Sequence, residues 1–237
     1  MAAYDKYSRY YDAIKGSRRE KLALIRKLIA CYNRNAKTVL EIACGTGALL
    51  KELSRKYEVC GLDMSGAMLE IAKKQAPHAK LFRQDMTRIR LDDRFDVILC
   101  IFNSINHLLG LDKWKKTFES VCEHLNDGGI FIFDINTKQA LKMLVAERFS
   151  FYKIQKDFII TECSHDGGGV MNFNIKMLEH KGHNRYLLSE ENIKEISFSV
   201  RDVADFLNGI YSRVKVLGPG NTAFPFSQEK AVFVCRK

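Results

Sequence analysis

The sequence predicts an α/β fold, a doubly wound parallel sheet that carries an antiparallel β insertion. Between residues 37 and 135, short apolar runs alternate with amphipathic helical segments, which is typical of a parallel sheet covered on both faces. Successive runs lie roughly 20 residues apart, the length of one strand–helix unit. Residues 149–200 instead contain three strand-like runs separated by turns at 167–169 and 181–184, which indicates antiparallel strands.

The remaining core elements follow in order along the chain. A helix is expected at residues 20–33, where Leu22, Ile25 and Ile29 lie on one helical face. Strands are expected at residues 38–43, 59–62, 81–82, 95–102 and 130–135, with helices at 48–56, 65–75 and 113–125 between them. After the insertion, a helix at 201–209 and strands at 213–217 and 231–235 return to the core pattern.

The chain carries a net positive charge, which is unevenly distributed along the sequence. A formal charge of +10 favours an anionic partner, such as a nucleic acid, an acidic membrane or a phosphorylated small molecule. Residues 1–37 hold ten Lys or Arg against three Asp or Glu, whereas residues 150–200 hold six against seven. An insertion that gripped a nucleic acid would be expected to be basic. We therefore expect a phosphorylated small molecule and regard nucleic acid as unlikely.

Composition excludes several other classes of protein. With 46% hydrophobic and 28% charged residues, the chain is globular rather than disordered. Its longest apolar run, residues 97–102, is too short to cross a membrane, and the N-terminal residues lack a signal peptide's apolar stretch. The seven cysteines include no C-x-x-C pair, so we expect reduced thiols, a cytoplasmic location and no metal site.

A glycine-rich turn follows the first strand, with the sequence EIACGTG at residues 41–47. Such a turn lets a ligand approach the backbone closely. A phosphate-binding P-loop would end in Lys-Ser or Lys-Thr, which the following Leu49, Leu50 and Lys51 do not supply. A dinucleotide fingerprint would place a small residue where Leu50 stands. Both alternatives are therefore disfavoured.

Five segments in register resemble the motifs of class I S-adenosylmethionine-dependent methyltransferases. They are residues 39–47, 59–65, 83–86, 95–100 and 125–129, which together cover about the first 135 residues. Ala43 stands where this family often has glycine. The resemblance implies a Rossmann-like sheet of seven strands, with the insertion after the fifth, and S-adenosylmethionine as cofactor.

The resemblance also implies a set of cofactor-binding residues. Asp63, at the end of the second strand, would hold the ribose hydroxyls, and Asp85 would accept a hydrogen bond from the adenine amino group. Met64 and Met86 would flank the adenine ring. The remaining expected contacts are Tyr11, Arg19, Glu41, Ala43, Gly45, Gly47, Met68 and Ile101, with Arg18 beside Arg19 as a further candidate for the cofactor carboxylate or a substrate phosphate.

The sequence indicates the methyl acceptor less specifically than it indicates the cofactor. Residues 101–109 contain neither the Asn/Asp-Pro-Pro-Tyr motif of amide and adenine methyltransferases nor the Pro-Cys of cytosine enzymes. They resemble the small-molecule N-methyltransferases, particularly those that act on nucleotide-linked amino sugars. His107 then has two open interpretations: a general base for the acceptor, or a structural residue that either caps the following helix or packs beneath the insertion. Tyr11 could close over the cofactor and contact the acceptor, or simply pack in the core.

These observations predict a methyltransferase that transfers a methyl group to a nitrogen or oxygen of a small molecule by in-line displacement. An RNA or protein methyltransferase, or a non-catalytic cofactor-binding protein, are the alternatives. We divide the chain into an N-terminal helical cap and cofactor-binding core (1–148), an antiparallel β lid (149–200) and a C-terminal completion of the core (201–237). A homodimer is left open.

Overall fold

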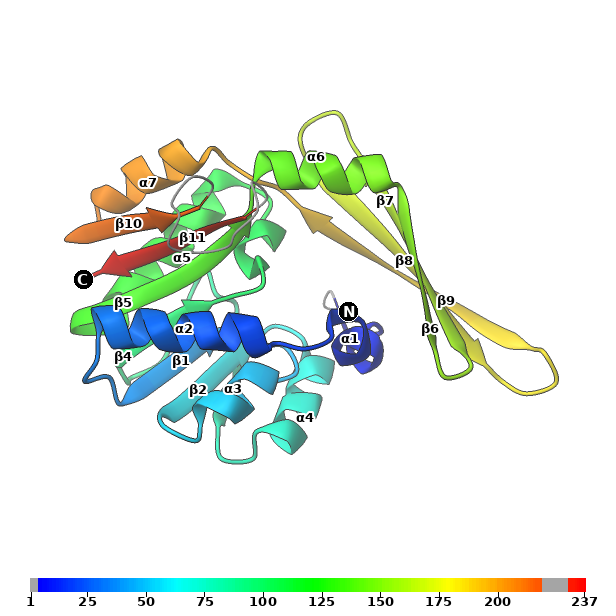
Figure 1. The fold of residues 1–237 in the computed structure, drawn as a ribbon, viewed down its shortest axis with the longest axis horizontal. Coiled ribbons are helices and arrows are strands. Elements are labelled where there is room, and N and C mark those ends of the chain that lie inside the picture. Colours follow the sequence, from blue (N-terminus) through cyan, green and yellow to red (C-terminus); the bar gives the residue numbers. More distant parts are fainter. Residues whose placement is uncertain (1–3, 219–229) are drawn as a thin grey trace.

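The computed structural model describes residues 4–218 and 230–237 as a broad core with an elongated second sheet beside it (Figure 1). The core sheet has seven strands in the order β10-β11-β5-β4-β1-β2-β3. Their bounds are β1 Thr38–Ile42, β2 Glu58–Asp63, β3 Lys80–Arg83, β4 Phe95–Cys100, β5 Leu125–Asn136, β10 Arg213–Leu217 and β11 Lys230–Arg236. The predicted fold class is thus confirmed.

The central strands of this sheet are parallel and the last two are not. β1 pairs in parallel with β2 and β4, and β4 with β5, whereas β11 runs antiparallel between β5 and β10. The order reverses between β1 and β4, and in doubly wound sheets a ligand crevice forms at the carboxyl ends of the strands where the order reverses. This topology places the glycine turn after β1 at the mouth of that crevice.

Helices cover both faces of the sheet, as near-continuous apolar strands require. One face packs against α5 (Leu111–Glu123) and α7 (Val200–Asn208), and buries Trp114 and Phe118 completely. The other packs against α2 (Arg19–Tyr32) and α3 (Ala48–Leu53), burying Leu28 and Leu50, while α4 (Gly66–Gln75) flanks β2 and β3. The core therefore fixes the strand ends that form the candidate site.

The insertion is a sheet of four strands rather than the three expected. It consists of β6 (Phe149–Ile154), β7 (Asp157–His165), β8 (Met171–His180) and β9 (Tyr186–Glu195), which pair in sequence order. The run expected to be one strand reverses after Ile154, where Gln155 adopts a positive φ of 55°. The two residues of this turn, Gln155 and Lys156, are not among the usual turn residues, so the sequence gives little sign of a reversal there. We call this four-stranded sheet the lid.

Two helices have no counterpart among the expected elements. α6 (Lys138–Glu147) links β5 to the lid, and α1 (Ser8–Lys15) lies between the lid and the core (Figure 1). Tyr7 and Tyr10 of the N-terminal segment pack on lid residues Ile159, Ile175 and Met177. α1 thereby closes the space between the two sheets. Among the described helices, none is both long and apolar enough to span a membrane.

Candidate active site

A cavity of about 220 Å³ opens at the carboxyl ends of β1, β2 and β4, beneath the N-terminal segment. Eight of the residues expected from the sequence line it: Tyr11, Ala43, Gly45, Asp63, Met64, Met68, Met86 and His107. They come from segments that are separate in the chain but follow neighbouring strands. We call this the cofactor cavity.

Asp63 ends β2 with its carboxylate inside the cofactor cavity. Its Oδ2 accepts a hydrogen bond from the Gly45 N–H at 2.8 Å, and its Oδ1 accepts one from the Ser65 N–H at 2.9 Å. Burial raises the pKa of this carboxyl although the two N–H groups oppose the shift. Each oxygen of a carboxylate can accept a second hydrogen bond. Asp63 can therefore receive a pair of adjacent hydroxyls while it orders the glycine turn.

The two glycines of this turn have different surroundings: there is open space beside Gly45 and close packing beside Gly47. A Cβ on Gly45 would meet nothing nearer than Met68 Sδ at 4.0 Å, so a ligand can lie against this residue. A Cβ on Gly47 would fall 2.9 Å from Ala72 Cβ, because the turn packs closely on α4. Ala43 has a positive φ of 54°, a conformation that disfavours a side chain. This strain accounts for the common use of glycine at its position.

Glu41 is buried close to this turn, and one oxygen of its carboxyl group lacks a hydrogen-bond partner among the described residues. Its side chain is buried, and its Oε2 has no hydrogen-bond partner in the described part of the chain. Burial raises the pKa of Glu41 to about 8, although the Arg18 guanidinium opposes the shift. An orphaned buried oxygen next to an open glycine backbone fits a ligand that brings a positive charge or a donor. The residues present thus suit an amino-acid nucleoside cofactor.

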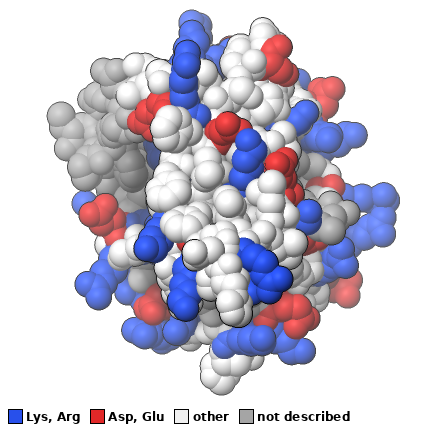
Figure 2. All heavy atoms as spheres, turned by 90° about the vertical axis from the view of Figure 1, so that its right-hand side faces the viewer, with Lys and Arg blue, Asp and Glu red and all other residues white. Residues whose placement is uncertain are grey.

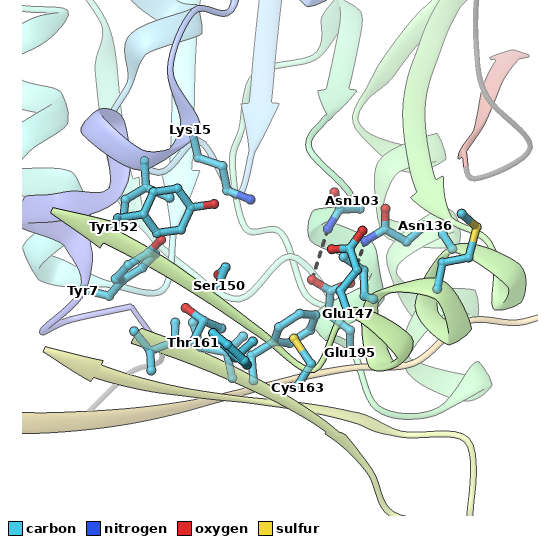
Figure 3. Close-up of a pocket in the computed structure, with 18 of the residues that line it drawn as sticks. Tyr7, Lys15, Asn103, Asn136, Glu147, Ser150, Tyr152, Thr161, Cys163 and Glu195 are labelled. Carbon is cyan, nitrogen blue, oxygen red and sulfur yellow. Dashed lines mark hydrogen bonds between the residues drawn. The ribbon is translucent and has the colours of Figure 1, made fainter. Parts of the chain in front are cut away.

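A second cavity, of about 360 Å³, lies between the lid, α1 and α6, and we call it the acceptor cavity. Polar side chains from well-separated segments face it (Figure 3). Three residues, Tyr4, Lys15 and Asn103, line both cavities. The two cavities therefore meet at these residues, which define the junction.

The turn after β4 contains Asn103, one of the junction residues, and its backbone is strained. Phe102 and Asn103 both have positive φ values, of 64° and 54°. The Asn103 N–H donates to Asp134 Oδ1 at 2.9 Å, and Asp134 Oδ2 forms a buried ion pair with Lys21 at 2.7 Å. Backbone strain of this kind persists only where the surroundings hold it, and it is concentrated at functional sites.

His107 ends the short 3₁₀ helix that follows, at residues Ser104–His107. Its Nδ1 lies 3.1 Å from the Lys194 carbonyl oxygen, so Nδ1 carries the proton and donates to that carbonyl. Its Nε2 then accepts from the Tyr4 hydroxyl at 2.9 Å. Gly110, not His107, caps α5. As a structural residue, His107 packs beneath the lid and does not cap α5, whereas its role as a base stays a prediction.

Comparison with known proteins finds relatives for the part of the chain that carries the cofactor motifs. A model of the methyltransferase domain matches residues 39–129. A dTDP-3-amino-3,6-dideoxy-α-D-glucopyranose N,N-dimethyltransferase from Streptomyces fradiae is 34% identical over 108 residues, which cover 45% of this chain and 42% of that protein. The chain spans about half the length of the curated relatives that it matches first.

Solved structures show the same fold over nearly the whole chain. An S-adenosylmethionine-dependent methyltransferase from Clostridium acetobutylicum has a TM-score of 0.83 at 24% identity, with 98% of both chains covered. The amino pentose methyltransferase CalS10 from Micromonospora echinaspora, solved with S-adenosylmethionine bound, has a TM-score of 0.75 at 18% identity and covers 100% of this chain and 98% of its own. In fold, and over residues 39–129 in sequence, the chain is similar to the class I S-adenosylmethionine-dependent methyltransferases. The family resemblance of the motifs is thus confirmed.

Besides the buried Glu41, four residues expected at the cofactor do not line its cavity. Arg19 is exposed and lines a separate surface hollow, Asp85 is exposed and accepts from the Thr87 N–H, and Ile101 is buried in the core. Gly47 sits behind the turn, against α4. Gln84 lines the cavity where its neighbour Asp85 does not. These four roles remain predictions.

Arg18, the candidate beside Arg19, lines the same surface hollow as Arg19. Its guanidinium also lies 5.7 Å from the ring centres of Tyr11 and Phe102 and donates to Asp12 at 2.6 Å. Several residues that line the two cavities were not expected from the sequence. Tyr4, Lys15, Asn103, Asn136 and Glu195 were not considered for the site, because each belongs to a different segment and none forms a local motif.

Proposed function

We propose that this chain uses S-adenosylmethionine to methylate a nitrogen or oxygen of a small-molecule acceptor. The observation that carries the proposal is the junction: a cavity built from the cofactor motifs meets a larger polar cavity at Tyr4, Lys15 and Asn103. Methyl transfer requires the donor and the nucleophile to meet in line with water excluded. Two adjacent cavities beneath α1 and the lid fit that arrangement.

Bound S-adenosylmethionine would supply an activated methyl group on a positively charged sulfur. Asp63 would hold the ribose diol through the free lone pairs of its carboxylate, and the Gly45 backbone would lie against the methionine part. Glu41 would take the amino group on its unpartnered oxygen. These assignments follow from the donors and acceptors that the described residues leave unused.

His107 would act through Tyr4 rather than directly. The Tyr4 hydroxyl lines both cavities and donates to His107 Nε2 at 2.9 Å, so its oxygen can accept at the junction. A protonated acceptor amine would pass its proton to the Tyr4 oxygen as the Tyr4 proton moves to His107 Nε2. Glu195 Oε1 lies 3.9 Å from Nε2 and would stabilise the resulting imidazolium. Tyr11, edge-on to Tyr4 at 5.7 Å, would hold Tyr4 in place.

A nucleotide-linked amino sugar is the acceptor class that we propose. The names of several relatives specify such substrates, and the acceptor cavity combines the buried carboxylate of Glu195 with Lys15 and Lys230, which suits a molecule that carries both an amine and phosphates. Seen from the lid side, positive and negative side chains are interspersed (Figure 2). A continuous basic surface for a nucleic acid is not visible on that face.

The test has a binding step and a transfer step. Calorimetry with S-adenosylhomocysteine should show one site per chain. Labelled methyl transfer should then be measured with dTDP-linked amino sugars, with the matching hydroxyl sugars, and with total RNA. Transfer to a nucleotide sugar supports the proposal. Absence of cofactor binding would refute it, and transfer to RNA alone would replace the acceptor class.

A further inference from the structure

Glu195 is a buried carboxylate at the wall of the acceptor cavity. It is the last residue of β9, where the lid returns to the core, and its side chain is only 8% exposed. Figure 3 shows it beside Asn103 and Asn136, at the end of the cavity opposite Tyr7 and Tyr152. A carboxylate is rarely buried to this degree without a partner of opposite charge.

The partners of this carboxylate are neutral amides. Oε1 accepts from Asn103 Nδ2 at 3.2 Å, and Oε2 accepts from Asn136 Nδ2 at 2.8 Å. Within residues 4–218 and 230–237, no Lys or Arg forms an ion pair with Glu195. The imidazole of His107, 3.9 Å away, is neutral while it accepts from Tyr4. The negative charge is thus oriented but not neutralised by these side chains.

Lys15 is the cationic residue of the junction. It lines both cavities, but it is exposed to solvent and is not among the residues that form ion pairs with Glu195 in the described part of the chain. Solvent weakens the interaction of an exposed ammonium group with a carboxylate. A cation that enters the acceptor cavity therefore meets a desolvated, unneutralised carboxylate.

The position of Glu195 is fixed by a set of amide bonds at the lid root. Asn106 Nδ2 donates to the Ile196 carbonyl at 2.8 Å, and Asn106 Oδ1 accepts from the Asn136 N–H at 3.0 Å. These bonds tie the end of β9 to the end of β5 and to the strained turn after β4. Because that turn also carries Asn103 at the junction, a group held by Glu195 would stand next to the cofactor cavity.

We infer that Glu195 is the specificity-determining residue that selects a protonated amine over a hydroxyl as the acceptor. A carboxylate forms a charge-assisted hydrogen bond with an ammonium group that is roughly twice as strong as a bond between neutral groups. A hydroxyl in the same place offers only the weaker contact. This inference rests on the proposed function and adds the residue that decides between nitrogen and oxygen acceptors.

Glu147 provides the matched control. It lines the same cavity and carries the same chemical group, but it is exposed at the end of α6, where solvent weakens its interactions. Glu195→Gln keeps the shape of the side chain and one of the two amide contacts while it removes the charge. Glu147→Gln makes the same chemical change at the exposed position. Glu195→Asp retains the charge with a shorter reach, and thermal unfolding of each variant reports its folding.

The experiment measures binding by calorimetry with S-adenosylhomocysteine already bound. The probes are dTDP-3-amino-3,6-dideoxy-α-D-glucopyranose and the same nucleotide sugar with a hydroxyl in place of the amino group. The unsubstituted chain should bind the amine at least about tenfold more tightly. Glu195→Gln should abolish that preference by weakening the amine alone, with affinity for S-adenosylhomocysteine unchanged, while Glu147→Gln should change each affinity less than about twofold.

Two results would overturn the inference without touching the proposed function. One is a folded Glu195→Gln variant that keeps its preference for the amine. The other is an unsubstituted chain that binds S-adenosylhomocysteine but binds the hydroxyl sugar as well as the amino sugar, or binds neither. Loss of S-adenosylhomocysteine binding in the unsubstituted chain is the different outcome that refutes the proposed function itself.

Discussion

The cofactor cavity and the acceptor cavity are built in different ways. Most of the cofactor cavity comes from strand ends within residues 43–108, where a turn or an acid follows each strand of the parallel sheet. The acceptor cavity draws on α1, the turn after β4, α6 and all four lid strands, from Tyr4 to Lys230. Features shared by the family therefore reside in local backbone geometry, whereas recognition of the acceptor arises from side chains brought together only by folding.

The core and the lid, which supply most of these two cavities, also differ in the interactions that stabilise them. The core sheet is buried on both faces by large apolar clusters. The lid shares a small cluster with α1 and is otherwise fastened by polar bonds: Tyr10 to Asp157 at 2.8 Å, Arg9 to Glu179 at 2.8 Å, and the Tyr7 N–H to Glu191 at 2.9 Å. The ion pair is exposed and the other two bonds are partly buried, so each stabilises the attachment of the lid only modestly. The lid is consequently the part that can move with least loss of free energy.

A Gly→Ala substitution in the core and one in the lid should give the largest difference in the free energy of unfolding. In Gly47→Ala the new methyl group would lie 2.9 Å from Ala72 Cβ at a φ of +72°, so overpacking adds to backbone strain. In Gly182→Ala, at a lid turn with φ of +82°, the methyl group would meet nothing within 4 Å. We expect a loss of about 3 kcal/mol in the free energy of unfolding for the first and about 1 kcal/mol for the second.

Urea unfolding followed by circular dichroism measures both losses. Equal losses in Gly47→Ala and Gly182→Ala would mean that α4 moves away to admit the methyl group. The close packing of the glycine turn on α4 would then not be what positions the cofactor cavity.

The two acids expected at the cofactor offer the next test. Asp63 lies inside the cavity with a free lone pair on each oxygen, so Asp63→Ala should weaken S-adenosylhomocysteine binding about 100-fold, the loss of two hydrogen bonds to a charged group. Asp85 is exposed at the rim, and Asp85→Ala should weaken binding less than about fivefold. Calorimetry distinguishes these outcomes. Equal losses would show that Asp85 turns inward when the cofactor binds.

Much of the core could be predicted because each of its features is local. The alternation of apolar runs and helices predicted the parallel sheet, and an acid at a strand end predicted Asp63 in the cavity. Asp85 shows the limit of that reasoning: it also follows a strand, yet the chain turns so that Gln84 faces inward. The direction of a side chain just beyond a strand depends on the turn geometry, which a short motif does not specify.

The lid and the junction could not be predicted to the same extent. The reversal after Ile154 uses Gln155 in a left-handed conformation, supported by strand pairing rather than by a turn residue. Tyr4 reaches the site only because α1 packs on the lid, and it bonds His107 across 103 residues of sequence. In the sequence, nothing distinguishes Glu195 from the other polar residues of its strand. Long-range contacts of this kind leave no periodicity or spacing to detect.

The buried acid of the core should make stability depend on pH. Glu41 has a folded-state pKa of about 8, above the ordinary value of an unfolded glutamate, so the folded chain holds the proton more tightly. Its contribution is fully present below the unfolded pKa and is lost as the pH rises through 8. We expect the free energy of unfolding to fall by about 2 kcal/mol between pH 6 and pH 8, and Glu41→Gln to remove that fall.

Urea unfolding at several pH values gives this slope for both chains. The exposed acceptor-side acid again serves as the comparison, since Glu147→Gln should leave the slope unchanged. A Glu41→Gln slope equal to that of the unsubstituted chain would assign the pH dependence to another group.

The smallest expected effect concerns the strain in the cofactor loop. Ala43 has a φ of 54°, which a glycine adopts freely, so Ala43→Gly should stabilise the chain by about 1 kcal/mol and raise Tm by roughly 2–4 °C. The same change at Ala204, within α7, should destabilise by about 1 kcal/mol, because glycine weakens a helix interior. Calorimetric unfolding of the pair gives opposite signs if the loop is strained. Destabilisation by both would mean that the Ala43 methyl group contributes more through packing than its backbone loses, and that the cofactor side is held by side chains as much as the acceptor side is.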